Sequence, residues 1–260
     1  MLEWIYRGQA KASWTLMSSF DRSPSLLELD PDIENLLIGE YQRAIRSFDD
    51  RPDIPTTTLD WLALLQHYRT PTRLIDFTRS PYVAAYFAFQ EEHDDEEEPV
   101  AIWCVDRIAF YQAAVYYLKN KIEITKFLSH QHVFWSAAFE KLHSMPNVDC
   151  VMPFDLSSAN QRQLNQQAVF LVAMNINKPF AEQLEFLDYQ GSPVINKLTI
   201  PRSDREVALR DLMKMNITHA TLFPGIDGFS RSLSLKYSTL ATFGDTAKWH
   251  AQLEKDGFAT

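Results

Sequence analysis

Hydrophobic and polar positions along the chain follow two periods. Alternating residues, or short apolar runs bounded by turn residues, predict β-strands, and apolar residues near helical spacing predict helices. We expect strands over Glu3–Gly8, Thr72–Phe77, Val100–Val105, Ala168–Ile176 and Ala220–Phe223, with Ala168–Ile176 the strongest central strand. We expect helices over Asp32–Phe48, Leu59–Tyr68, Tyr82–Gln90, Ile108–Phe139, Arg205–Met215 and Ser230–Phe243. Interleaved helices and strands indicate a mixed α/β class, either α/β or α+β.

Local signals indicate where several of these elements begin. Thr58 is expected to cap the helix that starts at Leu59. Ser80-Pro81 combines a hydroxyl N-cap with proline at the first helical position. The helix that follows is apolar nearly all round, so it should be buried. A turn is expected over Pro224–Gly228.

Composition favours one globular domain in a reducing compartment. The 260 residues are 46% hydrophobic, and neither an internal repeat nor a Gly/Ser-rich linker divides them. We therefore expect a single domain over residues 1–260 with a possible helical insertion at about 107–150. Cys104 and Cys150 lack CxxC spacing, which disfavours a disulfide framework or a zinc knuckle. The absence of a secretory signal or long apolar run predicts a cytoplasmic protein without a membrane partner.

The net charge of −9 is partly local, because the run Glu91–Glu98 carries seven carboxylates. Such a run is typical of a solvated loop. The chain lacks the basic footprint of a protein that grips nucleic acid through phosphates. A transient nucleic-acid substrate stays open.

Three groups of polar residues are candidates for chemistry. Arg7 ends a strand beside Gly8, whose small size lets backbone approach closely, and this suits a phosphate or carboxylate ligand. The alternative is an exposed strand-end arginine. The stretch Gln66–Pro81 contains the end of one helix, a strand and the N-terminus of the next helix. Free N–H groups at a helix N-terminus attract anions.

Each residue of that stretch also has a structural alternative. His67 is either a base or a structural histidine, and Asp76 is either catalytic or a cap of a nearby turn. Arg73 and Asp76 are three apart and should point to opposite faces of their strand. The third group, Asn160–Gln167, places amides at the mouth of a buried strand, where they bind a ribose or carboxamide, or satisfy loop backbone.

Other chemistries find little support. The sequence has no GxSxG, P-loop, HExxH or GxGxxG motif in the required setting. His130 and His132 lack matching carboxylates, so no metal site is expected, and a metal-dependent nuclease built on Asp76 and Glu91 is unsupported.

Several of these residues resemble the FRG domain family, named after an aromatic-Arg-Gly motif. The resemblance lies in Trp4–Gln9, Trp14-Thr15-Leu16, Arg22, Trp61–Tyr68, Pro71–Pro81 and Val83–Ala88, and later in Asn160–Phe170 and Leu222–Gly228. Arg69 and Ala168 stand where the family often has glycine, and Ala168 would narrow a nearby pocket.

The layout of that family is similar to an ADP-ribosyltransferase fold, which implies a split β-sheet core surrounded by helices. In that fold a first-strand arginine grips NAD, a second strand carries small polar residues, and a third begins with a glutamate. The resemblance implies catalytic roles for Arg7, His67, Asp76 and Gln167. It implies NAD contacts by Tyr6, Arg7, Gly8, Gln66, His67, Tyr68, Arg73, Thr78, Ser80 and Gln166.

Gln166-Gln167 stands where the glutamate is expected, and an amide cannot accept a proton as a carboxylate does. Either Asp76, Glu123 or Glu140 supplies the acid, or catalysis relies on positioning and electrostatics. If no carboxylate reaches the site, the domain binds NAD without turning it over.

Three functions follow as hypotheses. The first is an NAD-dependent ADP-ribosyltransferase that uses no metal and modifies a macromolecular acceptor, either protein or RNA. The resemblance extends this to a bacterial toxin or phage-defence effector restrained by an antitoxin or regulatory protein. The second is a non-catalytic nucleotide-sensing or interaction module on the same fold. The third is a nucleotide hydrolase or nuclease using His67 and Asp76.

Overall fold

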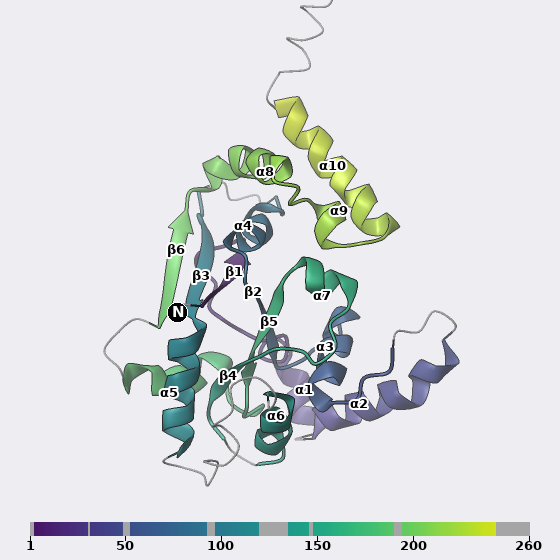
Figure 1. The fold of residues 1–260 in the computed structure, drawn as a ribbon, viewed down its shortest axis with the longest axis vertical. Helices are drawn as coiled ribbons and strands as arrows, with labels where there is room; N and C mark the ends of the chain where they lie inside the picture. The colour runs from purple at the N-terminus through teal and green to yellow at the C-terminus, as the bar shows by residue number, and fades with distance from the viewer. Residues whose placement is uncertain are drawn as a thin grey trace, which may run out of the picture.

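A mixed α+β architecture is seen in the computed structural model, which describes residues 3–30, 32–48, 53–92, 97–119, 135–145, 148–189 and 194–242. Six strands form one antiparallel sheet in the order β4-β5-β2-β1-β3-β6 (Figure 1). Their bounds are β1 Trp4–Gln9, β2 Leu74–Thr78, β3 Val100–Asp106, β4 Val151–Phe154, β5 Ala168–Ala173 and β6 Ile195–Ile200.

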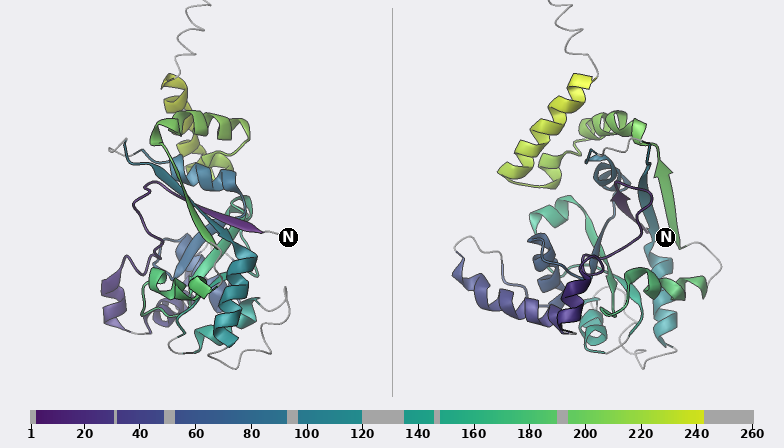
Figure 2. Two further views of the ribbon diagram at one scale, coloured as in Figure 1. Left: turned by 90° about the vertical axis from the view of Figure 1, so that its left-hand side faces the viewer. Right: turned by 180° about the vertical axis from the view of Figure 1, so that it is seen from behind.

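Helices cover both faces of this sheet. Those before β4 are α1 Pro24–Leu29, α2 Ile33–Ala44, η1 Ile45–Ser47, α3 Thr58–His67, α4 Pro81–Phe89, α5 Arg107–Lys119 and α6 Trp135–His143. Those after β4 are α7 Gln161–Asn165, η2 Phe180–Tyr189, η3 Arg202–Asp204, α8 Arg205–Lys214, α9 His219–Leu222 and α10 Ile226–Thr242. The views in Figure 2 place α8, α9 and α10 beyond α4, on the opposite side from α2, α5 and α6. No helix in the described ranges is long and apolar enough to cross a membrane.

Strand alternation divides the buried residues between two cores. Ile5 of β1 and Val105 of β3 point into the larger core, which α3, α5 and the strands β2, β4 and β5 complete. Tyr6 of β1 and Cys104 of β3 pack with the second core, formed by α4, α8 and α9. The period of two thus lets the same strands support helices on both faces.

The sheet splits between β1 and β2. These strands pair at one position, Tyr6 with Thr78, whereas β1 pairs with β3 over six positions and β2 with β5 over five. Beyond that pair, the Arg7 guanidinium spans the gap, and its Nη1 donates a hydrogen bond of 2.7 Å to the Asp76 carbonyl oxygen. Side chains, rather than a continuous ladder, therefore occupy the middle of the sheet.

Most strand and helix predictions are confirmed within a few residues, and the differences are local. Thr57, not Thr58, caps α3, because its side chain accepts from the Asp60 backbone N–H. The predicted strand Ala220–Phe223 is wrong: the segment is the helix α9, with a capping box between Thr218 and Thr221. The predicted turn over Pro224–Gly228 is cut short by α10, which begins at Ile226. Strands β4 and β6 were not predicted.

Two long predictions are confirmed in part. The helix expected over Ile108–Phe139 is present as α5 and α6, and residues 120–134 lie outside the described ranges. The strand expected over Ala168–Ile176 is present as β5, one position in from the sheet edge. The N-cap at Ser80 is confirmed, because its side chain accepts from the Val83 backbone N–H and begins the largely buried helix α4.

Gly8 has a packing role that the sequence did not reveal. A Cβ built on Gly8 would overlap the Ala84 carbonyl oxygen and lie 2.6 Å from the Ala88 backbone nitrogen. The glycine therefore allows close approach of the α4 backbone to β1. This contact fixes α4 directly above the strand that carries Arg7.

We expect Gly8→Ala to lower the free energy of unfolding by about 1–3 kcal/mol or more, since α4 must move away from β1 to admit the methyl group. Urea denaturation followed by circular dichroism measures this. Gly39→Ala is the matched control, because nothing lies within 4 Å of its added Cβ. Alanine at that α2 position should be neutral or stabilising by up to about 1 kcal/mol. Equal stability of the Gly8 variant and wild type would contradict the proposed contact.

Candidate functional site

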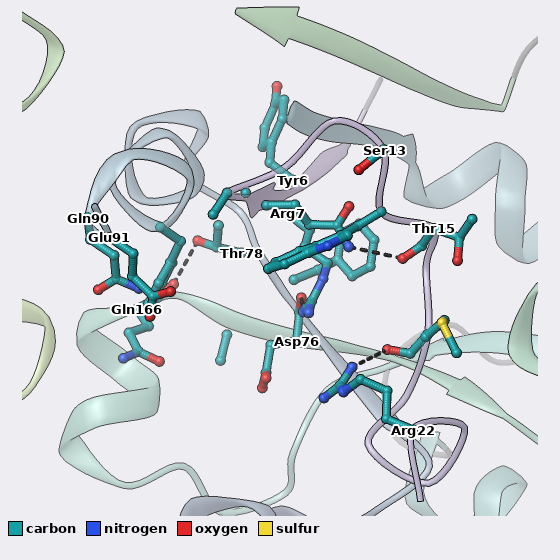
Figure 3. A pocket seen from close by; sticks show the side chains of 18 of the residues that line it. Tyr6, Arg7, Ser13, Thr15, Arg22, Asp76, Thr78, Gln90, Glu91 and Gln166 are labelled. Atoms are coloured by element: carbon teal, nitrogen blue, oxygen red, sulfur yellow. Dashed lines mark hydrogen bonds between the residues drawn. The ribbon is translucent and has the colours of Figure 1, made fainter. Parts of the chain in front are cut away.

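A cavity of about 750 Å³ lies at the split of the sheet. It is lined by β1, the segment after it, β2, the end of α4 and the α7–β5 connection (Figure 3). The lining residues are Tyr6, Arg7, Gly8, Gln9, Ala10, Ser13, Trp14, Thr15, Met17, Arg22, Asp76, Phe77, Thr78, Phe87, Gln90, Glu91, Arg162, Gln166 and Ala168. Its volume and its mixture of aromatic, cationic and acidic groups are typical of a small-molecule site.

Arg7 is the cation at the centre of this cavity. Its Nη1 bonds to the Asp76 carbonyl, but its Nε is buried and has no hydrogen-bond partner among the described residues. Burial lowers the pKa of Arg7 from its ordinary value, the charge of Asp76 opposes this shift, and Arg22 adds to it. A desolvated guanidinium with unused donor capacity is suited to bind an anionic ligand group.

Two carboxylates face the same cavity. Asp76 is exposed on β2, where its neighbours Ile75 and Phe77 are buried, and Figure 3 shows it beside Arg7. Glu91, just after α4, lines the side near Gln90 and Gln166 (Figure 3). A carboxylate is thus available for proton transfer although β5 does not begin with one.

Arg162 adds a second desolvated cation. Burial lowers its pKa, Asp76 opposes that shift and Arg69 reinforces it. Its guanidinium lies over the Phe223 ring, 4.5 Å from the centroid, and Phe223 in turn stacks on His219. The stack connects the cavity to α9, and burial lowers the pKa of His219 to about 4.

The two glutamines before β5 have different positions. Gln166 lines the cavity, but its side-chain Nε2 donates to the Leu222 carbonyl at 3.1 Å. The backbone carbonyl of Gln166 accepts from Thr78 Oγ1 at 2.7 Å. Gln167 is exposed, does not line the cavity, and has a left-handed φ of 48°. Ala168, which was expected near a pocket, lines the cavity.

Three of the remaining amides of the Asn160–Gln167 group form hydrogen bonds with backbone groups. Asn160 and Gln163 form a capping box at the start of α7. Asn165 Nδ2 donates to the Thr221 carbonyl at 2.6 Å, at the end of α9. Of the two alternatives considered, the satisfaction of loop and helix-end backbone therefore holds for these three side chains.

The end of α3 lies apart from the cavity lining. Gln66 Oε1 accepts from Thr72 Oγ1 at 2.5 Å, and the exposed Tyr68 makes an edge contact with the His67 ring. Burial, and then the charge of Arg162, lower the pKa of the half-buried His67. None of these three residues lines the cavity.

Arg73 and Ser80 also have structural partners. Arg73 is buried, forms an ion pair of 2.5 Å with Glu34, and donates to the Met174 carbonyl at 2.7 Å. It does not pair with Asp76, as the strand geometry predicted. Ser80 is buried as the N-cap of α4.

The other carboxylates considered as catalytic acids lie elsewhere or outside the described ranges. Glu140 accepts from the backbone N–H and the hydroxyl of Thr58, at 2.6 and 2.7 Å. Glu123, His130 and His132 lie outside the described residues. Among the residues that the structure describes, no cluster of His, Cys, Asp or Glu is arranged to hold a metal ion.

The cavity includes residues that the sequence reasoning did not assign to a site. Trp14 and Arg22 were named only as part of the family resemblance, Arg162 only as a member of the Asn160–Gln167 group, and Gln90 had no assigned role. A signal for Trp14 and Arg22 was present, because a tryptophan and an arginine follow the Arg7 strand closely in the sequence. Arg162 reaches the cavity through the fold, since its sequence distance from Arg7 exceeds any local motif.

Comparison with curated proteins and with solved structures gives no significant match. A family model does match part of the chain. It is described as the FRG domain, and it covers β1, β2 and α4 but not the Asn160–Phe170 and Leu222–Gly228 blocks. The stretch that carries Arg7, Asp76 and Glu91, residues 2–97, is thereby matched to the FRG domain family.

Proposed function

We propose that the chain is an NAD-dependent ADP-ribosyltransferase whose site is the cavity at the split of the sheet. The observation that carries the proposal is the convergence of Arg7 and Asp76 on that cavity from adjacent strands. Arg7 supplies a desolvated cation for the NAD diphosphate, and Asp76 supplies a carboxylate. The antiparallel sheet that splits beside the first-strand arginine supports an ADP-ribosyltransferase-like core.

The chemistry divides between these two groups. The bond between ribose C1′ and the nicotinamide nitrogen breaks, and its electron pair leaves with neutral nicotinamide. The acceptor nucleophile forms a new bond to C1′, and a carboxylate of the cavity takes the acceptor's proton. Asp76 or Glu91 also stabilises the positive charge that develops on the ribose. Arg7 positions the diphosphate so that C1′ is held in place.

The acceptor in this proposal is a macromolecule, either a protein or RNA. The net charge of −9 favours a protein over a polyanion. A modifying enzyme of this class fits a toxin or antiviral-defence effector in the cytoplasm, restrained by an antitoxin-like partner. Growth of cells that express wild type or an Arg7 variant tests that extension separately from the chemistry.

Asp76→Asn is the sharpest test of the reaction. The change keeps the size and polarity of the side chain but removes the proton acceptor, so we expect labelled ADP-ribose transfer to fall by at least about 100-fold. NAD affinity, measured by calorimetry, should change little. Glu91→Gln is the matched variant, because it removes the other carboxylate of the cavity. If both variants transfer at the wild-type rate, the proposed role of the cavity carboxylates is wrong.

A nucleotide-sensing module on the same fold is the second candidate. It is favoured by Gln166, whose amide is bonded to the Leu222 carbonyl, and by the position of Gln167 away from the cavity. Binding of intact NAD without nicotinamide release from the wild-type protein would favour this candidate over the transferase.

A further inference from the structure

The segment from residue 10 to residue 17 forms one wall of the cavity. Side chains from several elements form hydrogen bonds with its backbone. Lys197 Nζ of β6 donates to the Trp14 carbonyl at 2.9 Å and also to the Ala12 carbonyl. Gln9 Nε2 donates to the Thr15 carbonyl at 3.1 Å. The Ser13 backbone N–H donates to Glu98 at 3.1 Å. These hydrogen bonds hold the backbone of the loop in a fixed geometry.

Trp14 is the large aromatic side chain on this fixed loop. It lines the cavity and is 45% exposed, although tryptophan is highly buried on average in folded proteins. The exposure does not come from a loosely held backbone, because the Trp14 carbonyl is bonded to Lys197. A rigid, exposed indole at a cavity is the arrangement that stacks on flat ligand rings.

Arg22 lies on the same side of the cavity. Its Nη1 donates to the Met17 carbonyl at 3.0 Å, and Met17 is itself exposed at the wall. Figure 3 shows Arg22 and Thr15 on one side of Arg7, and Gln90, Glu91 and Gln166 on the other. The cavity therefore carries Arg22 beside the Trp14 segment and Glu91 beside α4. Arg162 of α7 also lines it, and its charge interacts favourably with that of Asp76.

The Arg22 side and the Glu91 side differ in the ligand charge that they favour. Arg7 and Arg22 repel each other, and a diphosphate placed between them would relieve that repulsion. The nicotinamide ring of NAD is cationic, so it is favoured on the side that carries Glu91, and Asp76 lies beside Arg7 at the centre of the cavity. The purine ring is neutral, so it can stack on the Trp14 indole without the charge repulsion that the cationic nicotinamide ring would meet beside Arg22.

We infer that Trp14 and Arg22 form the subsite for the purine nucleoside diphosphate half of the ligand, with the base stacked on the Trp14 indole. This inference rests on the proposed function and gives the dinucleotide a direction in the cavity. Trp14 determines which nucleotide binds, while Asp76 and Glu91 act at the other half.

The test measures binding of ADP and of nicotinamide mononucleotide to the full chain by calorimetry. We expect Trp14→Ala to weaken ADP binding about tenfold, because one base-stacking interaction is lost. Trp14→Phe should retain most of the affinity. Neither variant should change nicotinamide mononucleotide binding by more than about twofold. Tyr82→Ala is the matched control, since Tyr82 is 53% exposed on α4 and does not line the cavity.

Three results would overturn the inference: no ADP binding by wild type, unchanged ADP affinity in Trp14→Ala, or equal loss of both ligands in that variant. Unchanged melting of the variants shows that a loss is not due to unfolding. The outcome is separable from that of the proposed function. Selective loss of ADP binding in a protein that transfers no ADP-ribose supports the subsite and rejects the transferase. If Trp14→Ala transfers ADP-ribose at the wild-type rate, the transferase is supported and the Trp14 subsite is rejected.

Discussion

Arg7→Ala is expected to abolish measurable NAD-dependent transfer and to weaken NAD binding by more than about 100-fold. The loss of two charge-assisted hydrogen bonds at about 1.5–3 kcal/mol each corresponds to this change, at about 1.4 kcal/mol per tenfold. The Arg7 guanidinium already donates to the Asp76 carbonyl, and its buried Nε has capacity left. Labelling of cell lysate with radioactive NAD and calorimetry of purified protein measure the two effects.

The Arg7 prediction needs a control for the structural role of the same side chain. Arg7→Lys keeps a cation but loses the planar set of donors, so it should fold as wild type does and bind NAD less tightly. The exposed Arg43 of α2, paired with Glu40, is the matched surface site for Arg→Ala. If Arg7→Ala binds NAD with wild-type affinity, Arg7 does not bind NAD and the proposed site is wrong at its centre.

Arg73→Met is expected to lower the free energy of unfolding by about 3–5 kcal/mol, because it leaves the buried Glu34 carboxylate without its cation. The two side chains are only 7% and 4% exposed, and they form an ion pair of 2.5 Å. The change also leaves the Met174 carbonyl without the donor at 2.7 Å. Denaturant unfolding at neutral pH measures the loss.

A double variant separates the charge from the packing. Arg73→Met with Glu34→Leu should regain most of the stability, since a buried ion pair replaced by apolar side chains is often close to neutral. If the double variant is no more stable than Arg73→Met, then the uncompensated carboxylate is not the cause of the loss.

The same ion pair gives a pH dependence. Burial alone would raise the pKa of Glu34, but the charge of Arg73 and the hydrogen bond from His143 lower it below 4.5. A carboxyl group whose pKa is lowered in the folded state stabilises the protein above its unfolded pKa, and this contribution is lost as the pH falls through the folded pKa. In Arg73→Met the raising effect of burial on the pKa of Glu34 is no longer opposed by Arg73, so this carboxyl takes up a proton at a higher pH than in wild type. The difference in stability between wild type and Arg73→Met should therefore shrink as the pH falls from neutral.

The sequence predicted the parts of the site that local physics specifies. The strand predicted over Glu3–Gly8 is β1, which carries Arg7 two residues before its end, and Ser80-Pro81 marked the start of α4. The apolar run at Ala168 identified β5. The spacing of Arg73 and Asp76 placed them on opposite faces, and the structure puts one in the core and the other at the cavity.

Short apolar segments were ambiguous, and tertiary contacts decided them. Ala220–Phe223 reads as a strand, but a capping box at Thr218 begins a helix there. The amides of Asn165 and Gln166 then bind carbonyls at its end. These partners lie more than fifty positions away in the sequence, so no local pattern could reveal them.

By itself, the sequence determined which segments are strands and helices at the centre of the fold, because hydrophobic periodicity and capping act over a few residues. The tertiary structure decided which polar groups share a cavity. It brought the α4 backbone against Gly8, paired Arg73 with Glu34, and placed Arg7, Asp76 and Trp14 in one cavity. Such assignments depend on which side chains meet across the sheet, and those distances are fixed only when the whole chain is packed.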